Sequence, residues 1–259
     1  MDQGRLPAFW RLLRELTWVE FKLREQGTVL GFLWTLLYPL LMFIVLYLLF
    51  VRWLGKFVDM YAAYLLIGIV LWNFFQRTTC LALTSFSRRR SLIKNYKFPR
   101  EIILFSTIGS TLIPFVVELV LLLGFVLAFR VEPKLTWLFL PAVIAVQIVF
   151  VTGVSFFLPL IAAEYRDIER IWEVLTMALF YVTPVFYPLS IISEGKRTLL
   201  LYNPITQILI AARGCLIDGT IPLWPSFAVP LLEGLLLCAA GYYLMRRYEY
   251  HLVDRMMEP

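Results

Sequence analysis

The chain has 259 residues, of which 61% are hydrophobic and 16% are charged, and its formal net charge is +6. Soluble domains average about half apolar and a quarter charged residues, so this composition excludes an ordinary soluble protein. Several apolar runs reach about 18 residues or more, the length of a membrane-spanning helix, whereas a transmembrane β-barrel would show short alternating segments. The sequence therefore predicts an all-α integral membrane protein whose positive charge collects in the loops.

The first 28 residues do not form a span, because basic side chains interrupt them at Arg5, Arg11, Arg14, Lys22 and Arg24. Apolar side chains nevertheless recur at helical spacing between Leu6 and Leu16, with Trp and Phe among them. A basic helix with such an apolar side is typical of a helix that lies along a membrane surface. Residues 1–28 are thus predicted to form an amphipathic interface helix, and a solvated leader is the alternative.

Residues 29–259 are predicted to form one transmembrane domain with six spans. The spans are residues 29–51, 61–84, 102–129, 135–163, 171–189 and 223–245. About 20 helical residues cross the hydrocarbon core, so the third and fourth spans should tilt or protrude from it.

Residues 190–219 lie between the last two spans and hold two shorter apolar pieces on either side of Asn203-Pro204. Neither piece is long enough to span, so we predict a re-entrant or interfacial helical pair that acts as an outer gate. A plain extramembrane loop is the alternative. Pro184 and Pro188 should distort the end of the fifth span, which lets the chain turn into this pair.

The distribution of Lys and Arg predicts the orientation. With the N-terminus inside, the cytoplasmic segments carry 16 of these residues and the outer segments carry seven, with Arg77 left out because it lies within a span. Cytoplasmic loops of membrane proteins are enriched in Lys and Arg, so both termini are predicted to be cytoplasmic. The same charges should attract anionic membrane lipid.

No catalytic motif is visible in the sequence. It holds no H-E-x-x-H, no G-x-S-x-G, no Cys/His cluster and no G-x-x-x-x-G-K-[ST] phosphate-binding loop. The three cysteines are scattered and are interpreted as apolar fillers. We therefore predict a chain that is not an enzyme, that binds no metal or cofactor and that has no ATP site of its own.

Three charged residues lie well inside the predicted spans, namely Arg77, Glu118 and Glu233. Intramembrane charges are costly, so each is a candidate functional residue. Arg77 is close enough to a span end for its side chain to reach the interface. The two glutamates could pair across helices, face a water-filled path, or stay neutral because burial raises a carboxyl pKa.

The most basic segment of the chain is "SRRRSLIKNYKFPRE", residues 87–101, between the second and third spans. In a soluble protein it would suggest a nucleic-acid site, but its place between two spans excludes nucleic acid as a partner. Leu92, Ile93 and Tyr96 are predicted to share one face of a helix that Pro99 ends. This apolar face suits protein docking, and basic residues surround it, including Arg88, Arg89, Arg90 and Lys94.

Four stretches together resemble the membrane subunit of ABC-2-type polysaccharide exporters, a family that includes O-antigen, capsular-polysaccharide and teichoic-acid export permeases. They are "GTVLGFLWTLLYPLLM" (27–42), "IKNYKFPREI" (93–102), "TPVFYP" (183–188) and "YNPITQIL" (202–209). The resemblance covers nearly the whole chain. It implies a homodimer of six-span subunits in the inner or plasma membrane, with two copies of a separate ATPase chain that binds ATP and Mg. The implied substrate is a glycan on a polyprenyl-pyrophosphate carrier.

The resemblance also implies roles for particular residues. Residues 88–99 match the family's coupling helix, which contacts the ATPase, and Arg166 lies in a second, lesser contact loop. Spans one and five border the translocation path, and aromatic rings there suit sugars, which present C–H patches beside hydroxyls. The path residues are then Trp34, Tyr38, Phe180, Tyr181, Phe186 and Tyr187. Lys22 and Arg24 are expected to meet the pyrophosphate through charge-assisted hydrogen bonds.

Three alternatives to polysaccharide export stay open from the sequence. An ABC-2 permease of the same family could carry a drug or a lipid. An ion-coupled carrier would depend on Glu118 or Glu233. A membrane glycosyltransferase would need inward-facing acidic or histidine motifs, which this sequence lacks.

Overall fold

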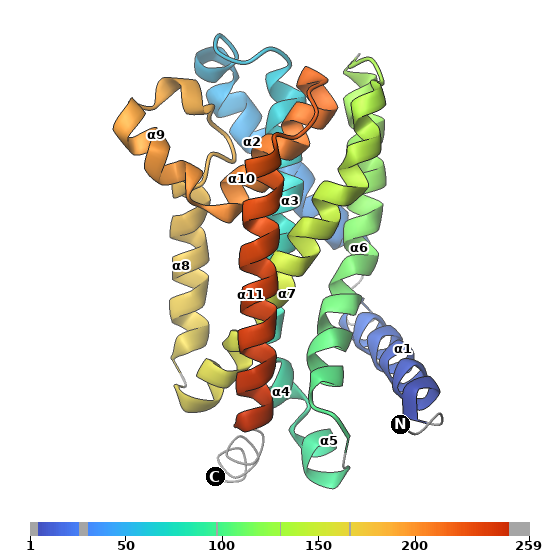
Figure 1. Cartoon of the computed structure of the whole chain (residues 1–259). Helices are drawn as coiled ribbons and strands as arrows, with labels where there is room; N and C mark the ends of the chain where they lie inside the picture. The colour runs from blue at the N-terminus through green and yellow to red at the C-terminus, as the bar shows by residue number, and fades with distance from the viewer. Residues whose placement is uncertain (1–4, 26–30, 97, 130, 166, 249–259) are drawn as a thin grey trace.

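The computed structural model describes residues 5–25, 31–96, 98–129, 131–165 and 167–248. Throughout these residues the chain is helical or irregular and contains no β-strand, as predicted. The long helices form one bundle, in which some stand upright and others cross it at a slant (Figure 1). The start of α1 (Arg5–Glu25) and the end of α11 (Trp224–Arg247) lie at the same end of this bundle.

Five helices in the described residues are long and apolar enough to cross a membrane, and the bent pair described below would make six. They correspond to predicted spans one, two, three, four and six to within a few residues at each end. The five are α2 (Leu33–Leu54), α3 (Tyr61–Leu83), α6 (Glu101–Ala128), η1 (Leu135–Phe139) with α7 (Leu140–Glu164), and α11.

The predicted fifth span, 171–189, is wrong in its extent. The helix there is α8 (Ile168–Val182), whose 15 residues fall short of the about 20 that cross the hydrocarbon core. It ends because Pro184 has no backbone N–H and forces the residue before it out of the helical region. Thr183 is accordingly extended, with φ −73° and ψ 138°, and residues 183–188 continue without helix.

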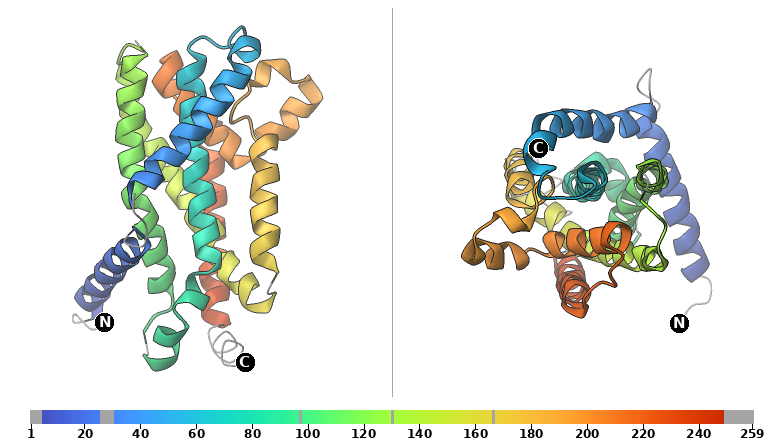
Figure 2. Two further views of the ribbon diagram at one scale, coloured as in Figure 1. Left: turned by 180° about the vertical axis from the view of Figure 1, so that it is seen from behind. Right: turned by 90° about the horizontal axis from the view of Figure 1, so that it is seen from above.

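Helix α3 lies at the centre of the bundle. Seen from above in Figure 2, it lies within a ring formed by α2, α6, α7, α8 and α10 (Pro204–Arg213). Its side chains form much of the core, including Leu65, Ile67 and Trp72, which are fully buried. A helix surrounded on all sides contacts protein rather than lipid, so α3 is free to carry polar side chains at membrane depth.

Those polar side chains join α3 to its neighbours. The Thr78 and Thr111 hydroxyls lie 2.9 Å apart between α3 and α6, and Gln147 Nε2 of α7 donates to the Leu71 carbonyl at 2.7 Å. Trp172 Nε1 of α8 donates to Thr79 Oγ1 at 3.1 Å. Hydrogen bonds between helices stabilise packing where lipid offers no alternative partner.

Helices α7 and α11 approach each other closely at two glycines. A Cβ atom added at Gly153 would lie 2.7 Å from the Gly234 carbonyl oxygen, and one at Gly234 would lie 2.9 Å from the Phe150 backbone. Small residues let membrane helices approach closely and gain dispersion contacts. This contact holds α11 on the outside of the bundle.

Candidate functional site

The basic segment forms two short helices rather than one. They are α4 (Ser85–Arg88) and α5 (Arg90–Asn95), separated at Arg89, and they lie at the same end of the bundle as the start of α1 (Figure 1). The prediction of one helix ended by Pro99 is wrong, because α5 already ends at Asn95. Tyr96 beyond it is extended, with φ −132° and ψ 138°.

The predicted apolar docking face also differs from the structure. Ile93 is only 5% exposed and packs into a core cluster with Phe86 and Ile103, so it anchors α5 to the bundle. Leu92 is half-buried, whereas Tyr96 is 64% exposed. The three residues do not share a face, because the helix stops before Tyr96, and only Leu92 and Tyr96 are open to a partner.

The basic residues around this segment have distinct environments. Arg88 Nη2 donates to the Leu81 carbonyl at 2.9 Å, near the C-terminus of α3, where a cation is favourable for the helix dipole. Arg100 Nη1 donates to the Ile93 carbonyl at 3.1 Å. Arg90 and Lys94 are exposed, and Arg166 lies outside the described residues.

A junction of α1, α4 and α6 forms around one carboxylate, Glu20. Thr107 Oγ1 lies 3.1 Å from Glu20 Oε1, and Ser106 Oγ lies 3.4 Å from Glu20 Oε2. Arg88 and Arg89 each place a guanidinium nitrogen 3.8 Å from this carboxylate. Glu20 was not among the predicted site residues, although its helical spacing from Thr17 and Arg24 was a usable signal.

The two residues predicted to meet pyrophosphate do not form a joint site. Arg24 faces α6, where its Nη2 donates to the Ser110 carbonyl at 3.1 Å. Lys22 is exposed on a different side of α1. A separation of two residues turns a helix by about 200°, so the two side chains diverge. Arg24 therefore fastens α1 to α6, and Lys22 alone points outward.

Two of the three intramembrane ionisable residues pair with each other. Arg77 Nη2 of α3 and Glu118 Oε1 of α6 lie 2.7 Å apart, and Glu118 is only 3% exposed. Among the possibilities considered for Glu118, pairing across helices is the arrangement found. Glu233 on α11 is half-buried, and no hydrogen bond or ion pair joins it to the described part of the chain.

The six aromatic residues predicted for the path divide into two groups. Trp34 and Tyr38 on α2 and Tyr181 on α8 are exposed on the surface of the chain. The other three pack within it: Phe180 against Trp72 (5.8 Å between ring centroids), Phe186 against Phe50 (5.1 Å), and Tyr187 against Phe186 (5.1 Å). The first group is more open to a ligand or to another chain than the second, in which Phe180 is buried and Phe186 and Tyr187 are half-buried.

The predicted helical pair between the last two spans is confirmed. It consists of α9 (Glu194–Leu201), then α10 with a π-helical turn (Gly214–Asp218), and the two parts meet at 95°. We call it the bent pair. Asn203 Oδ1 accepts a hydrogen bond from the Ile205 N–H at 3.0 Å, and Pro204 occupies the first turn, so the break is a regular helix start.

One buried arginine joins the bent pair to α3 and to the irregular segment 183–188. Arg213 Nη1 and Nη2 donate to the carbonyls of Pro184 and Val185 at 2.8 and 2.7 Å. Its guanidinium carbon lies 3.5 Å from the centre of the Tyr64 ring, a cation–π contact. Arg213 is one of the seven basic residues of the predicted outer segments, and nothing near it in the sequence indicates this role, because its partners lie far away in sequence.

The irregular segment 183–188 is held by side chains of two other elements. Tyr61 Oη and Tyr64 Oη of α3 donate to the carbonyls of Phe186 and Tyr187 at 2.9 and 3.0 Å. Asn203 Nδ2 donates to Thr183 Oγ1 at 3.0 Å. Irregular backbone at membrane depth needs such partners within the protein. Together with Arg213, they make the segment a fixed support for the bent pair.

Comparison with known proteins agrees with this architecture. The sequence profile described as ABC-2 type transporter matches residues 11–217. The chain is 30% identical over 241 residues to the O-antigen export system permease protein RfbA of Myxococcus xanthus, covering 92% of this chain and 93% of that protein. It is 25% identical over 250 residues to the O-antigen export system permease protein RfbA of Klebsiella pneumoniae, covering 96% of both chains.

Proposed function

The chain belongs to the ABC-2 type transporter family, and from this premise we propose that it is the permease subunit of a polysaccharide exporter. The observation that carries the proposal is similarity along almost the entire chain to proteins named O-antigen export permeases. The helices long enough to span a membrane and the bent pair are consistent with such a subunit. These relatives favour a glycan over a drug or a membrane lipid as the cargo.

ATP hydrolysis is assigned in this proposal to a separate chain. The functional unit would be a homodimer of this permease with two copies of an ATPase that holds ATP and Mg. The family and the lack of a phosphate-binding loop in this sequence support that division.

The bundle end that carries α4 and α5 is assigned to the cytoplasm. The Lys and Arg counts support this orientation, and the start of α1 and the end of α11 lie at that same end. Both chain termini would then be cytoplasmic.

The outward side of α5 is the proposed contact with the ATPase. Leu92 and Tyr96 supply apolar surface there, and the exposed Arg90 and Lys94 supply charge. Because Ile93 anchors α5 in the bundle core, a push on this side would be transmitted to α3 and α6. The Glu20 junction would carry the same motion to α1.

The exposed aromatic residues of α2 and α8 are the proposed glycan contacts. Trp34, Tyr38 and Tyr181 would face a path between two copies of the chain, with sugar rings lying against their faces. We assign Phe180, Phe186 and Tyr187 to the support of that surface.

The glycan is proposed to arrive on a polyprenyl-pyrophosphate carrier near α1. Lys22, which is exposed, remains the candidate for a direct contact with the pyrophosphate. Arg24, which donates to the Ser110 carbonyl, would position α1 instead.

Two measurements test the permease assignment. Deleting the gene should abolish surface polysaccharide, and the wild-type chain should restore it. Co-expression with the cognate ATPase should yield a stable complex, whereas the purified chain alone should not hydrolyse ATP. Robust hydrolysis by the lone chain would overturn the assignment. Export driven by a proton gradient without ATP, and lost when Glu118 and Glu233 are replaced by Gln, would favour an ion-coupled carrier.

The contact with the ATPase has a sharper test. Tyr96→Asp places a charge on exposed surface, so the permease should still fold while export falls and ATP hydrolysis becomes uncoupled from it. Ile93→Asp is the matched contrast, because it buries an unpaired carboxylate and should prevent folding. Normal export by the Tyr96→Asp variant would remove this surface from the coupling mechanism.

A further inference from the structure

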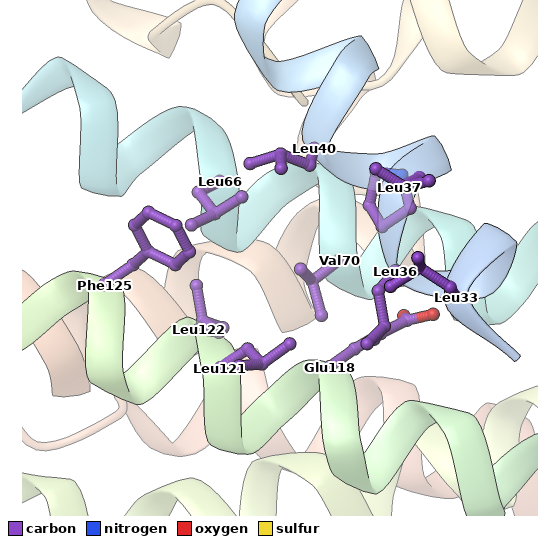
Figure 3. A pocket seen from close by; sticks show the side chains of 11 residues that line it. Leu33, Leu36, Leu37, Leu40, Leu66, Val70, Glu118, Leu121, Leu122 and Phe125 are labelled. Carbon is purple, nitrogen blue, oxygen red and sulfur yellow. The ribbon is translucent and has the colours of Figure 1, made fainter.

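A small cavity lies between α2, α3 and α6 (Figure 3). Its volume is about 150 Å³, and leucines of α2 form one wall. Leu66 and Val70 of α3 and Leu122 of α6 close the inner side. The lining is aliphatic or aromatic except for one residue, Glu118.

The cavity opens toward the lipid-facing side of the bundle. Leu33, Leu121 and Phe125 line its mouth and are exposed, Leu121 by 44%. All three belong to helices long enough to span the membrane. The molecules that reach this mouth are therefore those dissolved in the hydrocarbon core of the bilayer.

The carboxylate of Glu118 is the single polar group of the cavity, and only one of its two oxygens accepts a hydrogen bond from the described part of the chain. Glu118 Oε1 accepts the hydrogen bond from Arg77, whereas Oε2 is buried and accepts no hydrogen bond from the described residues. A buried acceptor without a donor is unfavourable, so a ligand that brings a donor to Oε2 binds more tightly than one that does not. The site thus presents one oriented acceptor at the end of an aliphatic slot.

The ion pair between Arg77 and Glu118 determines which kind of hydrogen-bond donor, charged or neutral, can bind at Oε2. Arg77 already neutralises Glu118 across 2.7 Å, so a cationic ligand would leave an uncompensated charge within the membrane. A lone water molecule would find one polar partner here, whereas buried waters normally make about three hydrogen bonds. A hydroxyl group attached to an aliphatic chain satisfies Oε2 without adding charge and fills the slot with carbon.

We propose that this cavity binds the hydroxyl end of a long-chain aliphatic alcohol drawn from the bilayer. The hydroxyl donates to Glu118 Oε2, and the first carbons of the chain contact Leu66, Val70 and Leu122. An apolar cavity of about 150 Å³ accommodates a group of roughly six carbons, the size of benzene. The rest of the chain leaves past Leu121 and Phe125 into the lipid.

This lipid site does not depend on the proposed export function. The cavity uses Leu33, Leu36 and Leu37 of α2, whereas Trp34 and Tyr38 are exposed on the surface of the same helix. Binding is therefore measured on the purified chain without ATPase or glycan, and its failure would leave the permease assignment untouched.

Photolabelling of the full chain in nanodiscs tests the site. The probes are two alcohols with a diazirine near the hydroxyl, one with a linear chain and one with an isoprenoid chain, and the methyl ether of each. Each alcohol that binds should label peptides of α2 and α6 around the cavity. Its ether, which lacks the donor, should label about tenfold more weakly at equal concentration, as loss of one hydrogen bond to a carboxylate implies.

Two substitutions on neighbouring residues provide the matched control. Leu121→Trp enlarges a side chain at the cavity mouth and should abolish labelling. Val120→Trp adds the same bulk on exposed surface that does not line the cavity and should leave labelling unchanged. Labelling by either alcohol supports the site and identifies the chain type it takes. Absence of labelling by both alcohols, equal labelling by alcohol and ether, or insensitivity to Leu121→Trp would overturn it.

Discussion

Helices α2 and α3 are consecutive in the chain, both apolar and of nearly equal length, yet their environments are opposite. In the most apolar 18-residue stretch of α3, 78% of the residues are buried, against 11% in that of α2. The more buried helix is also the more polar one, since it carries Asn73, Gln76, Arg77 and two threonines. In a bilayer, polar side chains belong inside the protein and purely apolar helices belong against lipid.

The two helices therefore serve different purposes. Polar groups of α3 bind α6, α7, α8 and the segment before the bent pair, so α3 organises the rest of the molecule. Helix α2 contacts the bundle on one side and presents its other side outward. Substitutions in α3 should change stability, whereas those in α2 should change what the protein binds, and four experiments test this difference.

The largest loss of stability is expected from a substitution of Gly68 in α3. A Cβ atom there would lie 2.4 Å from the Val185 carbonyl oxygen and 2.6 Å from Arg213 Nη2. Gly68→Leu should therefore destabilise the protein by about 3 kcal/mol or more and yield little monodisperse protein in size-exclusion chromatography. Gly124→Leu on α6 is the control, because its Cβ would meet nothing within 4 Å. Equal yields of the two variants would contradict this account of α3.

The next largest loss of stability is expected from a substitution of Arg213, which joins α3 to the bent pair. Arg213→Met leaves the Pro184 and Val185 carbonyls without their donors, which should destabilise the protein by roughly 2–3 kcal/mol. A thermal unfolding curve in detergent measures this loss. Arg197→Met removes an exposed arginine of α9 and should leave the curve unchanged. Similar curves for both variants would show that the bent pair is held by other contacts.

A smaller loss of stability is expected when the ion pair between Arg77 of α3 and Glu118 of α6 is broken. Arg77→Leu and Glu118→Leu should each destabilise the protein, because each leaves one charge without its partner. The double variant should be more stable than the sum of the single effects predicts, with a coupling free energy of about 1.5 kcal/mol, since polar pairs in membrane proteins reach roughly that value. A coupling near zero in this double-mutant cycle would mean that the ion pair does not contribute to stability.

The smallest change in stability is expected on the outward side of α2. Trp34→Ala should alter the free energy of unfolding by less than about 0.5 kcal/mol, because the side chain is exposed, yet export in cells should fall clearly. Trp53→Ala, on another side of the same helix, should affect neither property. A loss of stability in Trp34→Ala, or unimpaired export, would break the proposed difference between the two helices.

Much of the fold could be predicted because it depends on properties of single segments. The second and third spans, predicted at 61–84 and 102–129, are helices at Tyr61–Leu83 and Glu101–Ala128. Asn203-Pro204 likewise identified the break in the bent pair through local capping. The end of α8 was placed too late, because the effect of Pro184 was treated as a distortion rather than as the end of the helix.

The candidate site was predicted less well, because it depends on which helices meet. Helical spacing suggested a shared face for Leu92, Ile93 and Tyr96, but it could not reveal that Ile93 points into the bundle. Charge alone could not separate Lys22, which is exposed, from Arg24, which is held by α6. The residues next to Lys22 and Arg24 in the sequence do not indicate what either side chain contacts.

The sequence by itself determined three things: that the chain is an integral membrane protein, at which residues most of its helices begin and end, and at which residues the bent pair breaks. Each of these outcomes follows from how one stretch of residues is solvated or capped, which local composition decides. Only the tertiary structure decided the partners of the buried charges. Arg77 meets Glu118 across 41 residues, and Arg213 meets the Tyr64 carbonyl across 149. Such pairs depend on the arrangement of helices in three dimensions, because a charge buried within the membrane needs a partner that its own segment often cannot supply.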